Sequence, residues 1–158
     1  MFQAGEYVVY SNDGLCRIEK IGTPDFQPKG KEYYCLRQME DNGRIYVPLD
    51  TSRPLRLPMT ADEAERFLND LTAKTVDLPA KRDHKTVMPL LREMLKAQTA
   101  EAMGDVIKMI RALHREGKIP DEEALLLKRT EKRLGCEIAY ALQISETEAE
   151  ARIRRAAG

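Results

Sequence analysis

Few side chains of this sequence have the types and spacing that suit catalysis. The two histidines, His84 and His114, lie far apart in the chain, and neither has a patterned acidic or thiol neighbour. The phosphate loop Gly-x-x-x-x-Gly-Lys and the nucleophile elbow Gly-x-Ser-x-Gly are absent from the sequence. The carboxylates at 121–123 stand at a predicted helix start, where they offset the helix dipole. We therefore expect a protein that is not an enzyme, with no catalytic residue, no cofactor and no small-molecule substrate.

The three cysteines, Cys16, Cys35 and Cys136, are widely dispersed, and none belongs to a Cys-x-x-Cys pair. An odd and dispersed set indicates reduced, structural thiols rather than disulfides or a zinc site. No apolar run approaches the ~18 residues that a membrane helix needs, and the first residues lack the pattern of a signal peptide. We expect a cytoplasmic protein with no metal and no membrane contact.

The charged residues balance, with 26 basic and 26 acidic side chains. A whole-chain basic signature for nucleic acid is therefore missing, although a local patch would be enough to bind it. Most basic clusters in the second half suit a solvated helix face or a helix C-terminus. Residues 81–85, here called the basic segment, differ because they follow a predicted linker and precede a helix. That placement favours contact of Lys81, Arg82 and Lys85 with phosphates.

The first part of the chain has the pattern of short strands. Alternation of apolar and polar residues, with many β-branched and aromatic side chains, predicts strands at 6–10, 15–21, 32–39, 44–48 and 55–57. Turns are predicted at 12–14 and at 41–43, where Asn-Gly tolerates positive φ, and a loop at 22–30. Five short strands favour a small, strongly bent sheet or barrel. Tyr46, just before a strand end, is either a core residue or an exposed contact residue.

The pattern changes to helical periodicity after Pro58. Capping boxes at Thr60–Glu63 and Ser145–Glu148 predict the starts of the first and last helices. A linker is predicted at 73–81, with Pro89 in the first turn of the second helix or kinking it, and Gly117 ending the third. The apolar spacing predicts helices at 60–71, 85–97, 100–116, 120–142 and 145–155. The expected fold is α+β, with a barrel domain at 1–58 and an all-α domain of about five helices at 59–158.

The N-terminal pattern resembles the CarD family of bacterial transcription regulators, whose first module is shared with the polymerase-interacting domain of transcription-repair coupling factors. The helical part also resembles that family, at residues 110–113 with Gly117, at 120–123 and at 134–139. The residues that carry the N-terminal resemblance are Gly5–Tyr10, Gly14, Ile18, Ile21, Glu32–Leu36, Ile45–Pro48 and Leu55–Arg56.

The resemblance implies a Tudor- or SH3-like barrel that docks on the β subunit of RNA polymerase, through Arg44, Tyr46 and nearby Arg53. It also implies a helical domain that lies on promoter DNA at the upstream edge of the bubble and modulates open-complex stability. The candidate DNA contacts are Lys81, Arg82, His84 and Lys85. Such a protein would be associated with the nucleoid through the polymerase.

The chain departs from the family pattern in having no tryptophan, where many relatives place one at the start of the second helix as a wedge. The side chains left near that position are His84, Val87 and Met88. Zero net charge and the missing tryptophan favour a second hypothesis, an adaptor that docks on polymerase without productive DNA contact. The basic segment favours the first hypothesis, in which the protein also contacts the promoter.

Overall fold

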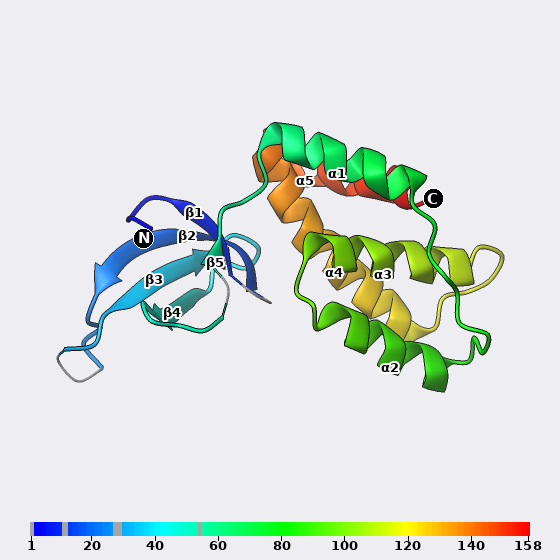
Figure 1. Cartoon of the computed structure of the whole chain (residues 1–158), viewed down its shortest axis with the longest axis horizontal. Helices are drawn as coiled ribbons and strands as arrows, with labels where there is room; N and C mark the ends of the chain where they lie inside the picture. The colour runs from blue at the N-terminus through cyan, green and yellow to red at the C-terminus, as the bar shows by residue number, and fades with distance from the viewer. Residues whose placement is uncertain (1, 11–12, 27–29, 54) are drawn as a thin grey trace. The chain divides into compact units, whose positions relative to one another are not determined.

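The computed structural model describes residues 2–10, 13–26, 30–53 and 55–158. The chain divides into two compact units, Met1–Pro58 and Met59–Gly158. The first is built from strands and the second from helices (Figure 1). We call them the strand unit and the helical unit. The predicted α+β layout is confirmed.

The strand unit is an open antiparallel half-barrel with the strand order β4-β3-β2-β1-β5. Along β2, Cys16 and Ile18 are buried while Arg17 between them is exposed, as expected of a strand with one face in the core. The register between β2 and β3 shifts after Ile18, and such a bulge increases the local twist. The strands are β1 (Tyr7–Tyr10), β2 (Gly14–Gly22), β3 (Tyr33–Gln38), β4 (Arg44–Pro48) and β5 (Leu55–Arg56).

The inner face of the half-barrel holds a small core. Ile18 and Leu36 are fully buried, and Phe2 packs edge-on against Tyr34 with 6.3 Å between the ring centroids. The predicted turn at 41–43 is present. Asn42 has a φ of 64°, a positive value that asparagine tolerates better than most residues. The turn predicted at 12–14 begins outside the described residues, and so does part of the loop predicted at 22–30. The core residues are Val8, Tyr10, Cys16, Ile18, Tyr34, Leu36 and Val47.

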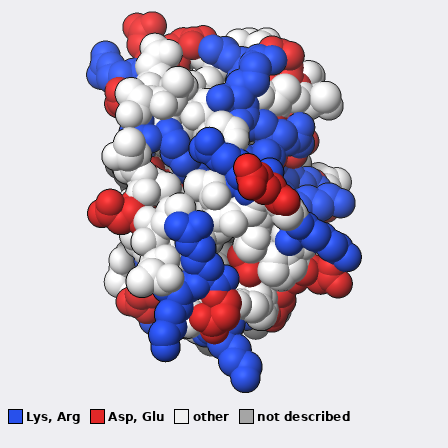
Figure 2. Space-filling model, turned by 90° about the vertical axis from the view of Figure 1, so that its right-hand side faces the viewer, with Lys and Arg blue, Asp and Glu red and all other residues white. Residues whose placement is uncertain are grey.

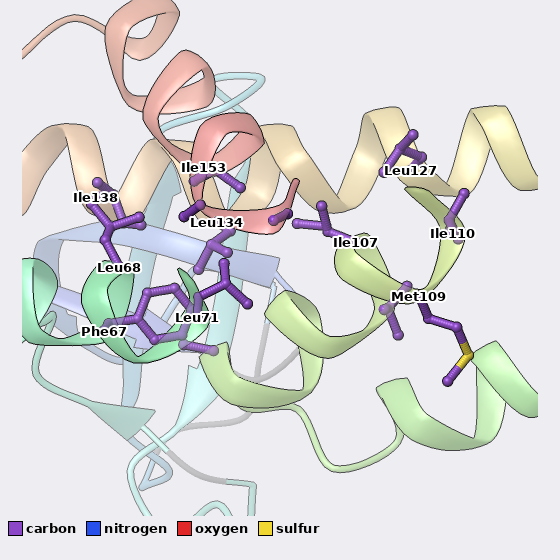
Figure 3. Packing of buried hydrophobic residues seen from close by; sticks show 14 of the residues in the cluster. Phe67, Leu68, Leu71, Ile107, Met109, Ile110, Leu127, Leu134, Ile138 and Ile153 are labelled. Carbon is purple, nitrogen blue, oxygen red and sulfur yellow. The ribbon is translucent and has the colours of Figure 1, made fainter. Parts of the chain in front are cut away.

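The helical unit has five helices around one apolar core (Figure 1). The longest helix, α4, packs against α3, α5 and α1. Figure 3 shows side chains of α1, α3, α4 and α5 meeting in this core, among them Leu71, Ile107, Leu134 and Ile153. The helices are α1 (Ala61–Ala73), α2 (His84–Leu95), α3 (Ala100–Leu113), α4 (Asp121–Leu142) and α5 (Glu146–Ala157).

Polar groups satisfy the ends of several helices. Thr60 and Glu63 form the predicted reciprocal capping box of α1. Ser145 Oγ accepts from the Glu148 amide at 3.1 Å, which is the hydroxyl half of the second predicted box. At the other end of α1, the Lys108 ammonium donates to the carbonyls of Leu71 and Thr72. Local sequence signals therefore set the starts of α1 and α5, while a cation from α3 donates to the carbonyls left free at the C-terminus of α1.

One predicted feature of the helical unit is wrong, and the structure excludes one of the two alternatives for Pro89. Gly117 does not end α3, because the helix stops at Leu113 and its C-cap is His114, which has a φ of −123°. The His114 ring is bound to Glu123 of α4, so a tertiary contact lies at the helix end. Pro89 is the sixth residue of α2 rather than part of its first turn. No helix among the described residues has the length and apolar character needed to cross a bilayer.

The core of the helical unit predicts a contrast between two leucines of α4. Leu134→Ala should lower the free energy of unfolding by about 2–5 kcal/mol, because this side chain is only 1% exposed and its loss leaves a cavity. Leu125→Ala makes the same chemical change where the side chain is 49% exposed, and should cost less than about 1 kcal/mol. Urea unfolding followed by circular dichroism measures both. Equal losses for the two variants would contradict the described packing of α4.

Candidate functional site

The strand β4 lies at one edge of the half-barrel and pairs only with β3 among the described residues. The Gln38 amide donates to the Gly43 carbonyl, and the Leu49 amide donates to the Glu32 carbonyl. Hydrogen-bonded pairs occur at every second residue of an antiparallel ladder. Because Gly43 and Leu49 bond to β3, the main-chain groups of Ile45 and Val47 also bond to β3. Arg44 and Tyr46 alternate with these residues along β4, so their main-chain groups point to the open edge.

The side chains of Arg44 and Tyr46 lie on the face opposite the core, because Ile45 and Val47 face inward. Tyr46 is half-buried, and its ring meets Phe26 edge-on at 4.8 Å between centroids. It also borders a hollow of about 70 Å³, together with Tyr33 and Cys35. Of the two interpretations left open for Tyr46, the structure supports an outer-face residue rather than a core residue.

On this outer face, Glu19 forms ion pairs with two arginines, Arg37 and Arg44. Arg44 Nε lies 3.4 Å from a Glu19 carboxylate oxygen, and Arg37 Nη2 lies 3.3 Å from the same oxygen. The Glu19 charge raises the pKa of Arg44, which is 52% exposed and fully cationic. Arg53, the third predicted polymerase contact, is exposed in the segment between β4 and β5. The edge therefore combines free main-chain groups with an aromatic side chain and exposed cations.

The basic segment, residues 81–85, leads into the first turn of α2. Lys81, Arg82 and Lys85 are exposed, and in the described part of the chain none of them has an ion-pair partner. Figure 2, which shows one face of the molecule, shows Lys and Arg side chains gathered across its middle with acidic ones among them. The three cations are thus free to meet an anionic ligand.

Two of the three side chains considered as a wedge are buried in the helical unit. Val87 is fully buried and Met88 is 5% exposed, and both pack in the core of the helical unit. They hold α2 against its neighbours and have no free surface for insertion into DNA. The third candidate, His84, is 39% exposed, but its ring faces carboxylates of α4.

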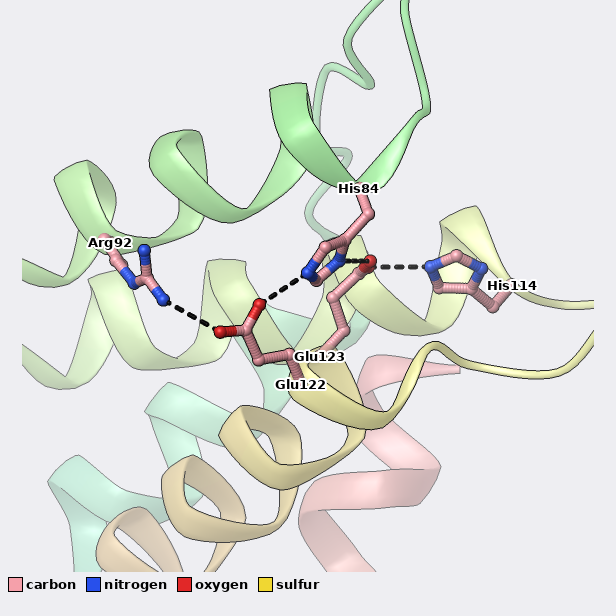
Figure 4. Close-up of polar contacts among 5 residues, drawn as sticks. All are labelled: His84, Arg92, His114, Glu122 and Glu123. Atoms are coloured by element: carbon pink, nitrogen blue, oxygen red, sulfur yellow. Dashed lines mark hydrogen bonds and ion pairs between the residues drawn. The ribbon is translucent and has the colours of Figure 1, made fainter.

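His84 belongs to a set of five contacting side chains that we call the histidine network (Figure 4). Glu123, which is fully buried, accepts from His84 Nδ1 at 3.0 Å and from His114 Nε2 at 2.7 Å, one on each oxygen. Glu122 lies 2.5 Å from His84 Nε2 and 3.3 Å from Arg92 Nη2. One buried carboxylate and its neighbour thus join the start of α2, the end of α3 and the start of α4.

The network raises the pKa of His84 above its ordinary value, chiefly through the hydrogen bond to Glu123 and then through that to Glu122. Sequence reasoning assigned the acids at 121–123 to the helix dipole and found no acidic partner for either histidine. The reason is distance along the chain, since His84 and Glu123 are 39 positions apart. Among the described residues, no group of three potential ligands is placed to hold a metal ion.

An open half-barrel with an unpaired edge strand offers main-chain groups with which a partner strand can pair. Residues 2–56 match the family model of the CarD-like/TRCF RID domain. The strand unit is therefore a domain of this family, an RNA polymerase-interacting module of transcription proteins, as the N-terminal resemblance predicted. The helical unit lies outside this match, so its resemblance stays a prediction. Comparison with curated proteins finds no match to the chain.

The histidine network predicts unequal roles for two adjacent acids. Glu123→Ala should lower the free energy of unfolding by about 1–3 kcal/mol, because it removes a buried acceptor shared by two imidazoles. Glu122→Ala removes a carboxylate that is 55% exposed and should cost less than about 1 kcal/mol. Denaturant titrations at about pH 6.5, near the ordinary histidine pKa, compare the two variants. A larger loss of stability for Glu122→Ala would overturn the described arrangement.

Proposed function

We propose that this protein regulates transcription by docking on the β subunit of RNA polymerase through the edge of β4, while its helical unit contacts promoter DNA. The observation that carries the docking is the family match of residues 2–56, combined with the open edge at Arg44 and Tyr46. A partner strand added to this edge would be held by main-chain hydrogen bonds. Tyr46, Arg44 and Arg53 would then supply side-chain specificity.

The proposed DNA contact rests on Lys81, Arg82 and Lys85. Their exposure and their lack of ion-pair partners in the described structure mean that phosphate binding would break no ion pair of the helical unit. Phosphate contacts position a protein on a duplex without reading its sequence. We leave His84 out of these contacts, because both of its ring nitrogens already face carboxylates. Bound at the upstream edge of the bubble, the helical unit would change the stability of the open complex.

A second function is an adaptor that binds polymerase without productive DNA contact. Specific observations favour it. The net charge is zero, no tryptophan is present, and Val87 and Met88 are buried. The protein would then recruit or shield a surface of the polymerase, and the helical unit would serve another partner. The salt dependence of promoter binding separates the two functions.

Docking through β4 predicts weaker polymerase binding when the edge is changed. Arg44→Glu combined with Tyr46→Ala should weaken binding to the isolated β subunit at least tenfold, which is about 1.4 kcal/mol. Arg17→Glu is the matched control, because Arg17 is exposed on the same face but two strands away from the edge. Surface plasmon resonance measures the affinities. Unchanged binding by a folded double variant would sink this docking surface.

DNA contact by the basic segment predicts a change in salt dependence. Replacing Lys81, Arg82 and Lys85 by Ala should reduce the slope of log K against log salt by about 0.9 for each phosphate that the protein no longer neutralises. Fluorescence anisotropy with polymerase-bound promoter DNA gives the slopes.

A second triple variant is the control for overall charge. Replacing Lys128, Arg129 and Lys132 by Ala removes the same charge from α4, where these side chains lie outside the basic segment. Equal reductions of the slope in the two triple variants would mean that overall charge, and not the basic segment, is responsible. A wild-type protein whose promoter binding has no salt dependence favours the adaptor.

A further inference from the structure

The ring of His84 is placed between two carboxylates in a way that depends on its protonation. Nδ1 lies 3.0 Å from a Glu123 oxygen, and Nε2 lies 2.5 Å from a Glu122 oxygen. Carboxylates only accept, so each nitrogen must donate to make a hydrogen bond. A neutral imidazole has one N–H, and only the imidazolium has two. With both acids ionised, the two hydrogen bonds form together only when the ring is charged.

We propose that the His84 imidazolium is a protonation-dependent latch that holds the start of α2, and with it the basic segment, against the start of α4. His84 acts as a positioning residue, and it does so through Glu122 and Glu123. The latch itself stands on the geometry of the helical unit. Its effect on DNA binding rests on the proposed function of the basic segment.

The start of α2 has few other means to hold its position. Its N-cap residue, Asp83, makes no side-chain hydrogen bond to the helix amides, and its carboxylate instead accepts from the Thr86 hydroxyl at 2.9 Å. Pro89 has no N–H, so it cannot donate to the Lys85 carbonyl one turn earlier. Further along, Val87, Met88 and Leu91 anchor the helix by burial. The residues before Val87 therefore depend on the polar tie, and the Thr86 and Val87 amides report on them because both donate to the Asp83 carbonyl.

The charges around His84 explain what loss of the proton would do. On α4 it faces Glu122 and Glu123, and these acids are shared with Arg92 of α2 and His114 at the end of α3. When His84 is neutral, one ring nitrogen presents a lone pair to a carboxylate oxygen, which is repulsive. Glu122 keeps Arg92 and Glu123 keeps His114, so the acids stay paired, while neutral His84 retains only one of its two hydrogen bonds between the first turn of α2 and α4.

The direction of the effect with pH follows from the raised pKa of His84 in the folded chain. Stabilisation by a group of this kind is fully present below the pKa of the unfolded chain and is lost as pH rises through the folded pKa. The latch is therefore closed in mildly acidic solution and opens as pH rises above the ordinary histidine range. The basic segment is held in one position only while the latch is closed.

Nuclear magnetic resonance of the full chain tests the latch directly. The ¹⁵N shifts of His84 should show both nitrogens protonated at about pH 6, below the ordinary histidine pKa. The ring should titrate at higher pH than the same histidine in the urea-unfolded chain. Amide exchange at 86–88, corrected for intrinsic rates, should become about fivefold faster once the ring is neutral, the effect of one missing hydrogen bond. Titration at or below the unfolded value overturns the latch.

Two variants separate the latch from other effects of pH. His84→Gln keeps a side-chain donor but does not titrate, so its exchange at 86–88 should show no pH-dependent step. His114→Gln leaves the His84 contacts in place and should retain the step. A step that persists in His84→Gln overturns the proposal. The ¹⁵N shifts and the titration of the His84 ring are measured on the wild-type chain, so they test the latch even if a variant fails to fold.

Promoter binding at one pH below and one pH above the titration midpoint that resonance gives for His84 then tests the link to function. The affinity at the lower pH divided by the affinity at the higher pH should exceed one in the wild type and fall towards one in His84→Gln. A normal latch in the resonance data with no difference in these ratios overturns the positioning of the basic segment. Absence of promoter binding at every pH, with the latch intact, instead identifies a failure of the proposed DNA contact.

Discussion

The helical unit depends on buried carboxylates that α4 carries into its core. Glu123 is fully buried and Glu131 is 4% exposed, and an anion in such a place must be paired to be tolerated. Glu123 is shared by His84 and His114, while Glu131 accepts from Arg111 of α3 and Arg154 of α5. Each acid therefore specifies which helices lie beside α4, since any other packing would leave a buried charge unpaired.

The strand unit is organised by a different constraint. Its core is apolar, and the main-chain polar groups of the described strands are paired in antiparallel ladders except along the open edges. Such an edge is a liability for aggregation unless a partner uses it. The family match of residues 2–56 and the exposed cations near β4 support the proposal that a protein partner docks on this edge.

The missing tryptophan takes on a different meaning once the helical unit is in view. The residue that begins α2 is a histidine turned towards α4, and the apolar residues that follow it are in the core. Contact with DNA would then rest on cations and phosphates rather than on an inserted side chain. That kind of contact responds to salt and to the placement of three side chains, Lys81, Arg82 and Lys85.

Local patterns in the sequence predict the strands, the Asn42 turn, the cap of α1 and the apolar faces of α1, α3 and α4. These features depend on residues within a few positions of one another, so periodicity and capping chemistry predict them. No local pattern predicts that His84 and His114 meet on Glu123, that α3 ends at Leu113, or that Val87 and Met88 are buried. Those outcomes depend on how helices dock, which brings together side chains that no local pattern relates.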